Sequence, residues 1–340
     1  MNPADPRMGV AIVTFHSSDV IIPCLDSLFA SEDVALQVVV IDNASGDDTV
    51  ALIREWAERR RVSEPGFTFA ELPAHSDASP TSALTLLRSE FNGGYGHGVN
   101  AGLRLLLRDP ALQMFWVLNP DCVIPPKTAA AYARAGADGA FALMSGRTVY
   151  CEEPDRIQSD GGRTNRWTGV CSSVHSGCAR ESTTMPDPAT IDFLTGGNVV
   201  ASRRFIDRAG LMPEDYFLYY EEVDWAMRRG DLPLRLAGDA VVQHHVGTSI
   251  GSGTDSRRAS PLANYFNYRN RIRFLRRFRA WAIPFGLAHA AAKSAQLTLQ
   301  GAPEEAYAAL AGAFGLPPPP AVRSRIAPGK ASEYAFGTPQ

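Results

Sequence analysis

The stretch Met114-Phe115-Trp116-Val117-Leu118-Asn119-Pro120-Asp121 decides the fold of this chain. Its first five residues are apolar, which favours a strand buried on both faces. The polar residues that follow place one carboxylate at the carboxyl end of that strand, where open α/β sheets carry their ligand chemistry. Taken alone, Asn-Pro-Asp fits a type I turn equally well. With its neighbours, it indicates that Asp121 lies in a site at the edge of a central sheet.

The sequence on both sides of this stretch alternates between strand and helix patterns. Apolar spacing predicts strands at 9–15, 36–41, 67–71 and 84–90, helices at 20–29, 49–61 and 99–108, and further ordered segments at 193–202, 216–229 and 234–244. Strands that alternate with helices predict an α/β fold with a doubly wound, mostly parallel sheet and flanking helices.

The chain divides into three predicted parts. Residues 8–255 form the catalytic domain, which includes an excursion of loops and short strands at 151–187. Residues 256–315 form a basic amphipathic helical extension, because 264–281 holds six arginines and no acid. That helix either packs back onto the domain or binds an anionic membrane surface. Residues 316–340 begin with four prolines after Leu316 and are predicted to be a mobile tail.

Composition narrows the class of protein. The chain has 340 residues, of which 45% are hydrophobic and 20% charged, as in ordinary globular proteins. A net charge of −3 gives no reason to expect a nucleic-acid partner. Five cysteines in a chain of this length favour reduced thiols, and no signal peptide or transmembrane-length apolar run is found. We therefore expect a cytoplasmic protein, with association at the inner face of the cell membrane left open, as is homo-oligomerisation.

Three further groups of polar residues accompany Asp121. Asp42 closes the apolar run 38–41, Glu222 and Asp224 lie in an acidic cluster, and His244 ends an apolar segment. Carboxylate oxygens and a neutral imidazole suit Mg²⁺ or Mn²⁺, so Asp121 and His244 are the candidate metal ligands. Individually, these residues fit turn chemistry, a solvated helix face and a structural histidine. Their joint occurrence favours a site.

The order of these motifs resembles that of the family 2 inverting glycosyltransferases of the GT-A fold, closest to the rhamnosyltransferase-like branch. The matching segments are 13–16, 40–47, 92–100, 118–121, 194–197, 216–224 and His244. The chain departs from the family at Phe15-His16, where Tyr-Asn is usual, and at Glu221-Glu222, where Glu-Asp is usual.

The resemblance implies a hexosyltransferase-type enzyme that needs a divalent metal. It would move a sugar, with rhamnose as one candidate, from a dTDP- or UDP-activated donor to a hydroxyl of a growing surface glycan or lipid-linked glycan. Glu222 would be the catalytic base, with Asp224 as its nearest substitute, and Asp42 would accept the imide hydrogen of uracil or thymine. Gly94 belongs to a glycine-rich loop expected to let the backbone approach the donor. The donor-binding residues would be Thr14, Phe15, Asp42, Asn92, Gly94, Asn100 and Asn119.

Two other classes of protein remain as alternatives. A nucleotidyltransferase also uses Asp and Mg²⁺, but residues 13–19 lack the Gly-rich activating loop with Arg and Lys that this class would show. A non-catalytic nucleotide- or glycan-binding module could retain the same fold. The carboxylates of Asp121 and Glu222 argue against such a module, because binding alone does not need them.

Overall fold

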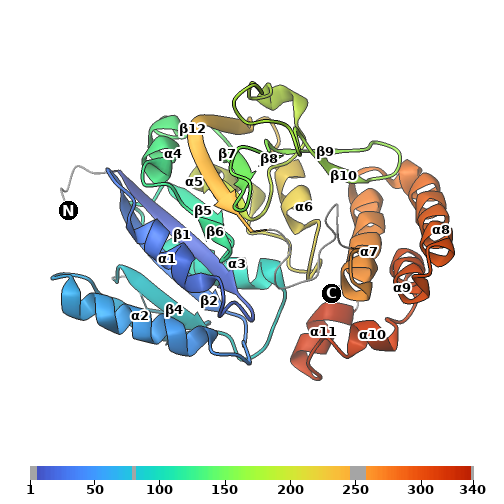
Figure 1. Cartoon of the computed structure of the whole chain (residues 1–340), viewed down its shortest axis with the longest axis horizontal. Helices are drawn as coiled ribbons and strands as arrows, with labels where there is room; N and C mark the ends of the chain where they lie inside the picture. The colour runs from blue at the N-terminus through green and yellow to red at the C-terminus, as the bar shows by residue number, and fades with distance from the viewer. Residues whose placement is uncertain (1–5, 79–81, 246–257, 338–340) are drawn as a thin grey trace.

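The computed structural model describes residues 6–78, 82–245 and 258–337 (Figure 1). The boundary expected at residues 255 and 256, between the catalytic domain and the helical extension, lies outside these ranges. The described chain forms a sheet layer covered by helices, with a group of helices from the C-terminal part at one side.

The central sheet has ten strands in the order β3-β4-β2-β1-β5-β11-β7-β12-β6, with β8 paired to β7. Strands β1 to β5 pair in parallel, whereas β11 and β6 run antiparallel to their neighbours. The predicted mostly parallel sheet is therefore confirmed. The strands are β1 (Arg7–Thr14), β2 (Ala35–Asp42), β3 (Phe69–Pro73), β4 (Leu84–Arg88), β5 (Met114–Leu118), β6 (Cys122–Val123), β7 (Leu143–Tyr150), β8 (Ile157–Ser159), β11 (Asn198–Ser202) and β12 (Arg235–His244).

Helices cover both faces of the sheet because side chains alternate along each strand. In β1, Val10 and Ile12 pack into a core shared with α1 and α2, whereas Ala11 and Val13 pack into the opposite core with α3. These helices and their neighbours in the domain are α1 (Ile21–Phe29), α2 (Thr49–Ser63), α3 (Tyr95–Leu106), α4 (Thr128–Ala135), α5 (Arg203–Ala209) and α6 (Glu221–Met227).

Helix α3 begins at Tyr95, four residues before the predicted start. The glycines that suggested a loop lie in its first turns, where they permit close packing. A Cβ at Gly96 would lie 2.7 Å from the carbonyl oxygen of Pro213, and one at Gly98 would lie 2.7 Å from Val13. The expected excursion of loops and short strands is present and includes the small sheet of β9 (Gly162–Thr164) and β10 (Cys171–Ser173) and the short helix η1 (Pro188–Thr190).

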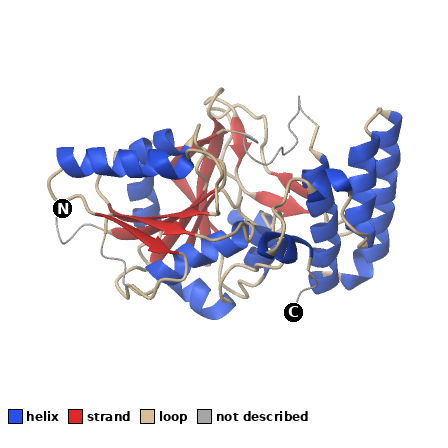
Figure 2. Cartoon of the chain, turned by 90° about the horizontal axis from the view of Figure 1, so that it is seen from below, coloured by secondary structure: helices blue, strands red, loops and turns tan. Residues whose placement is uncertain are grey.

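The C-terminal part is helical and packs against the catalytic domain (Figure 2). It comprises α7 (Pro261–Phe278), η2 (Ala280–Ala282), α8 (Ile283–Leu299), α9 (Pro303–Phe314), α10 (Pro320–Arg323) and α11 (Lys330–Phe336). None of the helices in the described ranges is both long and apolar enough to cross a membrane.

Helix α7 packs back onto the domain through its arginines. Arg277 forms ion pairs with Asp215 and Asp224, at 2.5 and 2.7 Å, and Arg271 donates to the hydroxyl of Tyr220. Much of the basic face that suggested membrane binding is thus used inside the protein. Of the two interpretations offered for this helix, the structure shows packing.

The tail was predicted to be mobile, and through residue 337 it is instead folded. Phe336 of α11 stacks on Phe266 of α7, with ring centroids 5.8 Å apart, and Val322 of α10 is completely buried. The physical reason is that Pro320 stands in the first turn of α10, where its fixed φ favours a helix instead of an extended linker.

Candidate functional site

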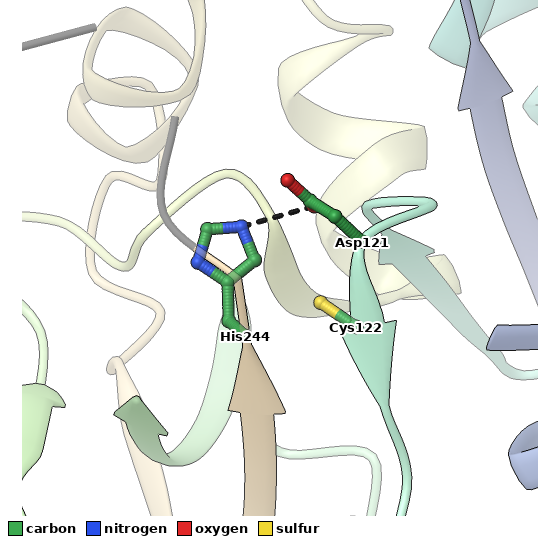
Figure 3. A group of neighbouring side chains, drawn as sticks. All are labelled: Asp121, Cys122 and His244. Atoms are coloured by element: carbon green, nitrogen blue, oxygen red, sulfur yellow. Dashed lines mark ion pairs between the residues drawn. The ribbon is translucent and has the colours of Figure 1, made fainter. Parts of the chain in front are cut away.

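Asp121 and His244 face each other at the carboxyl edge of the sheet. The Oδ1 atom of Asp121 lies 3.1 Å from Nε2 of His244 (Figure 3). The register of β12 against β6 pairs His244 with Cys122, which brings the imidazole beside the preceding aspartate. Two residues more than 100 positions apart are therefore brought together by strand pairing, as the metal-site hypothesis requires.

The side chains around this pair fit a hard divalent cation. Gln158 Oε1 lies 2.8 Å from Nδ1 of His244, which places the N–H on that side and leaves Nε2 as an electron-pair donor facing Asp121. Cys122 is the third member of the cluster, and its Sγ donates to the carbonyl of Gly197 at 3.6 Å. Oxygen and imidazole suit Mg²⁺ or Mn²⁺ better than a thiol does, so Asp121 and His244 are the better candidates for metal ligands within this cluster.

A pair of glycines connects this metal site to Glu222. Asn119 N donates to the carbonyl of Gly197 at 2.9 Å, and a Cβ on Gly197 would lie 2.7 Å from the Asn119 amide. A Cβ on Gly196 would meet the Glu222 side chain at 3.3 Å. Side chains at these two positions would fill the space between Asn119 and Glu222, so only glycine allows the two to approach.

Tyr95 ties the same elements together. Its hydroxyl lies 3.0 Å from Asn119 Oδ1 and 2.8 Å from the carbonyl oxygen of Gly196. Burial, with the charges of Glu221 and Glu222 adding, raises the pKa of Tyr95 well above its usual value. Tyr95 is thus a neutral hydroxyl that holds Asn119 in place beside the two acidic groups.

Glu222 lies in the second position of α6 and is partly buried. Burial raises its pKa to about 7, although backbone hydrogen bonds act in the opposite direction. Glu221 is more deeply buried, and burial together with the charge of Glu222 raises its pKa well above the usual value. Burial thus disfavours the charged form of Glu221 more than that of Glu222, so Glu222 is the better candidate of the two for a proton acceptor.

The turn before Glu222 is strained. Phe217, Tyr219 and Tyr220 all have positive φ, at 65°, 68° and 74°, a region that bulky residues rarely adopt. Asn270 of α7, itself completely buried, holds this turn by placing Nδ2 2.8 Å from the carbonyl oxygen of Tyr216 and 2.6 and 3.1 Å from those of Leu218 and Tyr219. The position of Glu222 thus depends on a helix that follows it by some 40 residues.

Asp224, the predicted substitute base, is held in a structural network. It is completely buried and accepts hydrogen bonds from Tyr216, Arg228 and Arg277 at 2.8, 2.6 and 2.7 Å. Because one hydroxyl and two guanidinium groups already donate to this carboxylate, and because it is shielded from solvent, it is poorly placed to accept a proton from a substrate. Asp224 instead links α6 to α7.

Asp42 occupies the end of β2 as predicted. Its Oδ1 lies 3.4 Å from the hydroxyl of Thr14, and its Oδ2 accepts from the Ser45 amide at 3.2 Å. Arg88 lies 3.6 Å from the carboxylate and lines a hollow of about 480 Å³ at the ends of β3 and β4. Asp42 is completely buried and does not line the hollow itself. Arg88 lies between the Asp42 carboxylate and the hollow.

The other predicted donor-binding residues fall into two groups. Phe15 is partly exposed and contacts His16, with ring centroids 4.3 Å apart, and Asn92 Oδ1 accepts from the Gly94 amide at 2.9 Å. Both belong to loops at the carboxyl edge of the sheet. Gly94 and Asn100 make packing contacts.

The structure gives Gly94 and Asn100 physical reasons other than donor contact. Gly94 has φ +90°, and a Cβ there would lie 2.4 Å from the carbonyl oxygen of Phe217. Asn100 is buried and donates to Met212 O and Glu214 Oε1, both at 2.8 Å. These two residues fix α3 against the segment that leads to α6.

Four residues near the site escaped sequence reasoning. Tyr95 was hidden in a presumed glycine loop, and Gln158 lies in the excursion, where periodicity is weak. Arg88 looked like the polar end of a strand. Asn270 carries no local signal at all, because its three carbonyl partners lie about 50 residues away.

Comparisons with known proteins agree with this architecture. The sequence model described as "Glycosyl transferase family 2" matches residues 9–208, more than half of the chain. No curated protein matches the chain by sequence.

Two solved structures share the fold. A mannosyltransferase, PcManGT from Pyrobaculum calidifontis, solved with GDP-Man and Mn²⁺, has a TM-score of 0.51 and 18% identity, covering 95% of this chain and 79% of that one. GalNAc-T7, solved with UDP, GalNAc and Mn²⁺, has a TM-score of 0.54 and 12% identity. That match covers 80% of this chain and about half, 51%, of GalNAc-T7. At these identities the likeness concerns the fold alone.

Proposed function

Because the chain belongs to glycosyl transferase family 2, we propose that it is a metal-dependent, inverting glycosyltransferase of the hexosyltransferase type. The observation that carries this proposal is the 3.1 Å approach of Asp121 to His244, with Glu222 held nearby across Gly196 and Gly197. One site thus combines cation ligands with a proton acceptor, which transfer from a nucleotide sugar requires.

Asp121 and His244 would hold the cation, Mg²⁺ or Mn²⁺. When bound, it neutralises the negative charge that grows on a diphosphate leaving group. Gln158 keeps the His244 tautomer that can coordinate, and Tyr95 holds Asn119 next to Asp121. The protein offers few anionic ligands of its own, so we expect metal affinity to be low without donor.

Glu222 is the proposed catalytic base. Inversion proceeds by one attack from the face opposite the leaving group, and it needs one group that takes the proton of the acceptor hydroxyl. A hydrolase would need two working carboxylates, one to protonate its leaving group. Here burial raises the pKa of Glu221 well above its usual value and Asp224 is engaged by arginines, so Glu222 is the carboxylate proposed to serve.

The donor is proposed to be a dTDP- or UDP-sugar, with dTDP-rhamnose as one candidate. Asp42 at the end of β2 supports a nucleoside at this edge, and the neighbouring Arg88 lines an open hollow there together with Glu71 and Glu90. The acceptor is proposed to be a hydroxyl of a glycan or lipid-linked glycan, presented at an anionic membrane surface.

Paired histidine variants test this function. Purified protein is incubated with Mn²⁺ and a panel of UDP-, dTDP- and GDP-sugars, and released nucleoside diphosphate is measured. Asp121→Ala and His244→Ala should each lower metal-dependent turnover by about 10²-fold or more. The matched control, His245→Ala, removes an imidazole whose Nδ1 pairs with the exposed Glu152, and it should change turnover little.

Thermal shift with free nucleotides identifies the base independently of turnover. Stabilisation by UDP or dTDP with Mn²⁺ supports the proposed donor, and stabilisation by GDP alone contradicts it. Equal turnover in the His244→Ala and His245→Ala variants would remove the metal site from the mechanism.

A further inference from the structure

Helix α8 presents an apolar stripe to the outside of the molecule. Its exposed positions follow helical spacing from Trp281 in η2 to Leu299, and Trp281, Phe285 and Leu299 are 50, 48 and 89% exposed. The smaller members of this stripe are Pro284, Ala288, Ala291, Ala292 and Ala295. The inner face, with Gly286, Ala290 and Leu297, is buried toward the neighbouring helices. A helix at the protein surface normally turns polar residues outward, whereas this one exposes mostly apolar residues, with Gln296 and Thr298 among them near its end.

A second segment extends the same face. Trp167, in the turn between β9 and β10, is 48% exposed and lies against Trp281 and Phe285, with ring centroids 4.9 and 5.1 Å away. Three large aromatic side chains from two distant parts of the chain thus form one exposed cluster, continuous with the stripe. We refer to the cluster and the stripe together as the aromatic face.

A cation stands in the aromatic face, and the segments that form the face carry no acid. The guanidinium of Arg166 lies 5.5 Å from the ring of Trp167 and 5.9 Å from that of Trp281. Residues 161–180 and 256–303, which supply the whole face, contain no Asp or Glu. The first acids after the stripe are Glu304 and Glu305, at the start of α9. The segments of the face therefore contribute positive charge without negative charge of their own.

Exposed tryptophan and phenylalanine, a line of small apolar residues and neighbouring arginines together match the chemistry of a lipid interface. The stripe spans 18 residue steps, or ~27 Å, which is longer than one sugar ring needs for stacking. A row of alanines has little surface relief that a specific protein partner could recognise. Acyl chains are fluid and can pack against such a row without shape complementarity. We propose that the aromatic face docks onto an anionic membrane, with α8 lying in the plane of the interface and Arg166 at the lipid phosphates.

This placement rests on the proposed function and makes it more specific. The carbonyl of Gly169, two residues after Trp167, accepts a hydrogen bond from the hydroxyl of Tyr220 at 2.8 Å. Tyr220 in turn lies two residues before Glu222. Docking through the aromatic face would therefore bring the membrane to the side of the protein that carries the proposed base, where a lipid-linked acceptor would enter.

Tryptophan fluorescence tests the docking without any assay of activity. Of the five tryptophans, Trp56, Trp116 and Trp225 are buried, so the two in the aromatic face report on it. The wild-type chain should be quenched by vesicles of phosphatidylcholine and phosphatidylglycerol with brominated acyl chains, and less by phosphatidylcholine alone. The double variant Trp281→Ser, Phe285→Ser should bind the anionic vesicles about tenfold more weakly or worse.

Matched variants separate the aromatic face from general surface hydrophobicity. Tyr307→Ser removes an exposed aromatic of α9, 51% exposed, and should leave vesicle binding unchanged, whereas Arg166→Glu should weaken it. Circular dichroism and the thermal shift with nucleotide and Mn²⁺ should be unchanged in all of them, which shows that fold and donor site are intact. Failure of the nucleotide shift in the wild type would count against the transferase and not against docking.

Three results would overturn the proposal. The first is the absence of binding to anionic vesicles by the wild-type chain. The second is quenching that persists in the double variant. The third is evidence that a second copy of the chain or a glycan occupies the aromatic face. A second copy would be seen as a dimer in solution that Trp281→Ser dissociates, and a glycan as a fluorescence change with soluble oligosaccharide but not with vesicles.

Discussion

The two halves of the site are built in different ways. Asp42 ends β2 and Asp121 follows β5, two strands that run parallel on either side of β1, and partners close in sequence or in the sheet, Ser45 and Thr14, hold Asp42. Glu222 follows a turn with three positive-φ residues that Asn270 holds from a distant helix. The sheet edge positions its side chains by ladder geometry, whereas the base depends on the docking of α7. The catalytic half should therefore be the more sensitive to changes far away.

The largest expected effect is on the base itself. Glu222→Gln keeps the shape of the side chain but cannot accept a proton, so kcat should fall by about 10²- to 10⁴-fold. Donor affinity, measured by thermal shift with nucleotide, should hardly change. The control Glu221→Gln replaces a more deeply buried group whose pKa burial raises well above the usual value, and it should lower kcat far less. Equal losses in the two variants would reject the division of roles between Glu221 and Glu222.

The next test removes the hydrogen bonds by which Asn270 of α7 holds the turn before Glu222. Asn270→Ala removes the donor that three carbonyls share, which should lower kcat by about tenfold through displacement of Glu222 and lower the free energy of unfolding by about 1–3 kcal/mol. Asn267→Ala, on the same helix, removes only an acceptor for Arg271 and serves as the control. Steady-state kinetics and chemical denaturation measure the two effects. A kcat that stays at the wild-type value would show that α7 is needed for stability alone.

The pH dependence of kcat/KM tests whether burial raises the pKa of Glu222 in the working enzyme. Because burial raises the pKa of Glu222 to about 7, the carboxylate that accepts the proton is lost as the pH falls through that value. The kcat/KM should rise about tenfold per pH unit below neutrality and level off above it. The Glu222→Gln variant should lack this ascending limb. If the ascending part of the pH profile instead has its midpoint near the ordinary pKa of glutamate, burial does not raise the pKa of Glu222 during turnover.

The smallest effect should come from α11, which contacts the donor side. Tyr334 lies against Phe91 and His97, with ring centroids 4.9 and 5.1 Å away, and Phe91 immediately precedes Asn92. Tyr334→Ala should raise the KM for donor by roughly two- to tenfold at constant kcat, because an aromatic contact that orders this loop is lost. Tyr334→Phe should behave as wild type and Tyr307→Ala is the surface control. A fall in kcat with unchanged KM would contradict this role.

The strand ends were predictable because their signals are local. An apolar run followed by a polar turn marks the end of a buried parallel strand, which placed Asp42 and Asp121 at one edge and is confirmed by the sheet. His244 could be named as the partner of Asp121, and the β12–β6 register brings the two together.

Other features of the structure were not indicated by a local pattern. Glycines at 94, 96 and 98 suggested a loop that lets the backbone approach the donor, and in the structure they also permit α3 and its first residues to pack closely against neighbouring segments. The arginines of α7 suggested either packing onto the domain or a membrane surface, and several pair with Asp215, Asp224 and backbone carbonyls. Neither outcome could be read from the residues, because the partners lie tens of positions away.

By itself, the sequence determined the alternating strands and helices, the polar residues at the strand ends and the family to which the chain belongs, since period and turn chemistry act over a few residues. Tertiary structure alone distinguishes the three acids near the site. Glu221, Glu222 and Asp224 are alike in sequence, and they differ because burial raises the pKa of Glu221 well above its usual value, arginines engage Asp224, and Glu222 lies beside Gly196 with its pKa raised to about 7. Burial and ion pairing depend on which distant segments pack together, and no stretch of sequence contains that information.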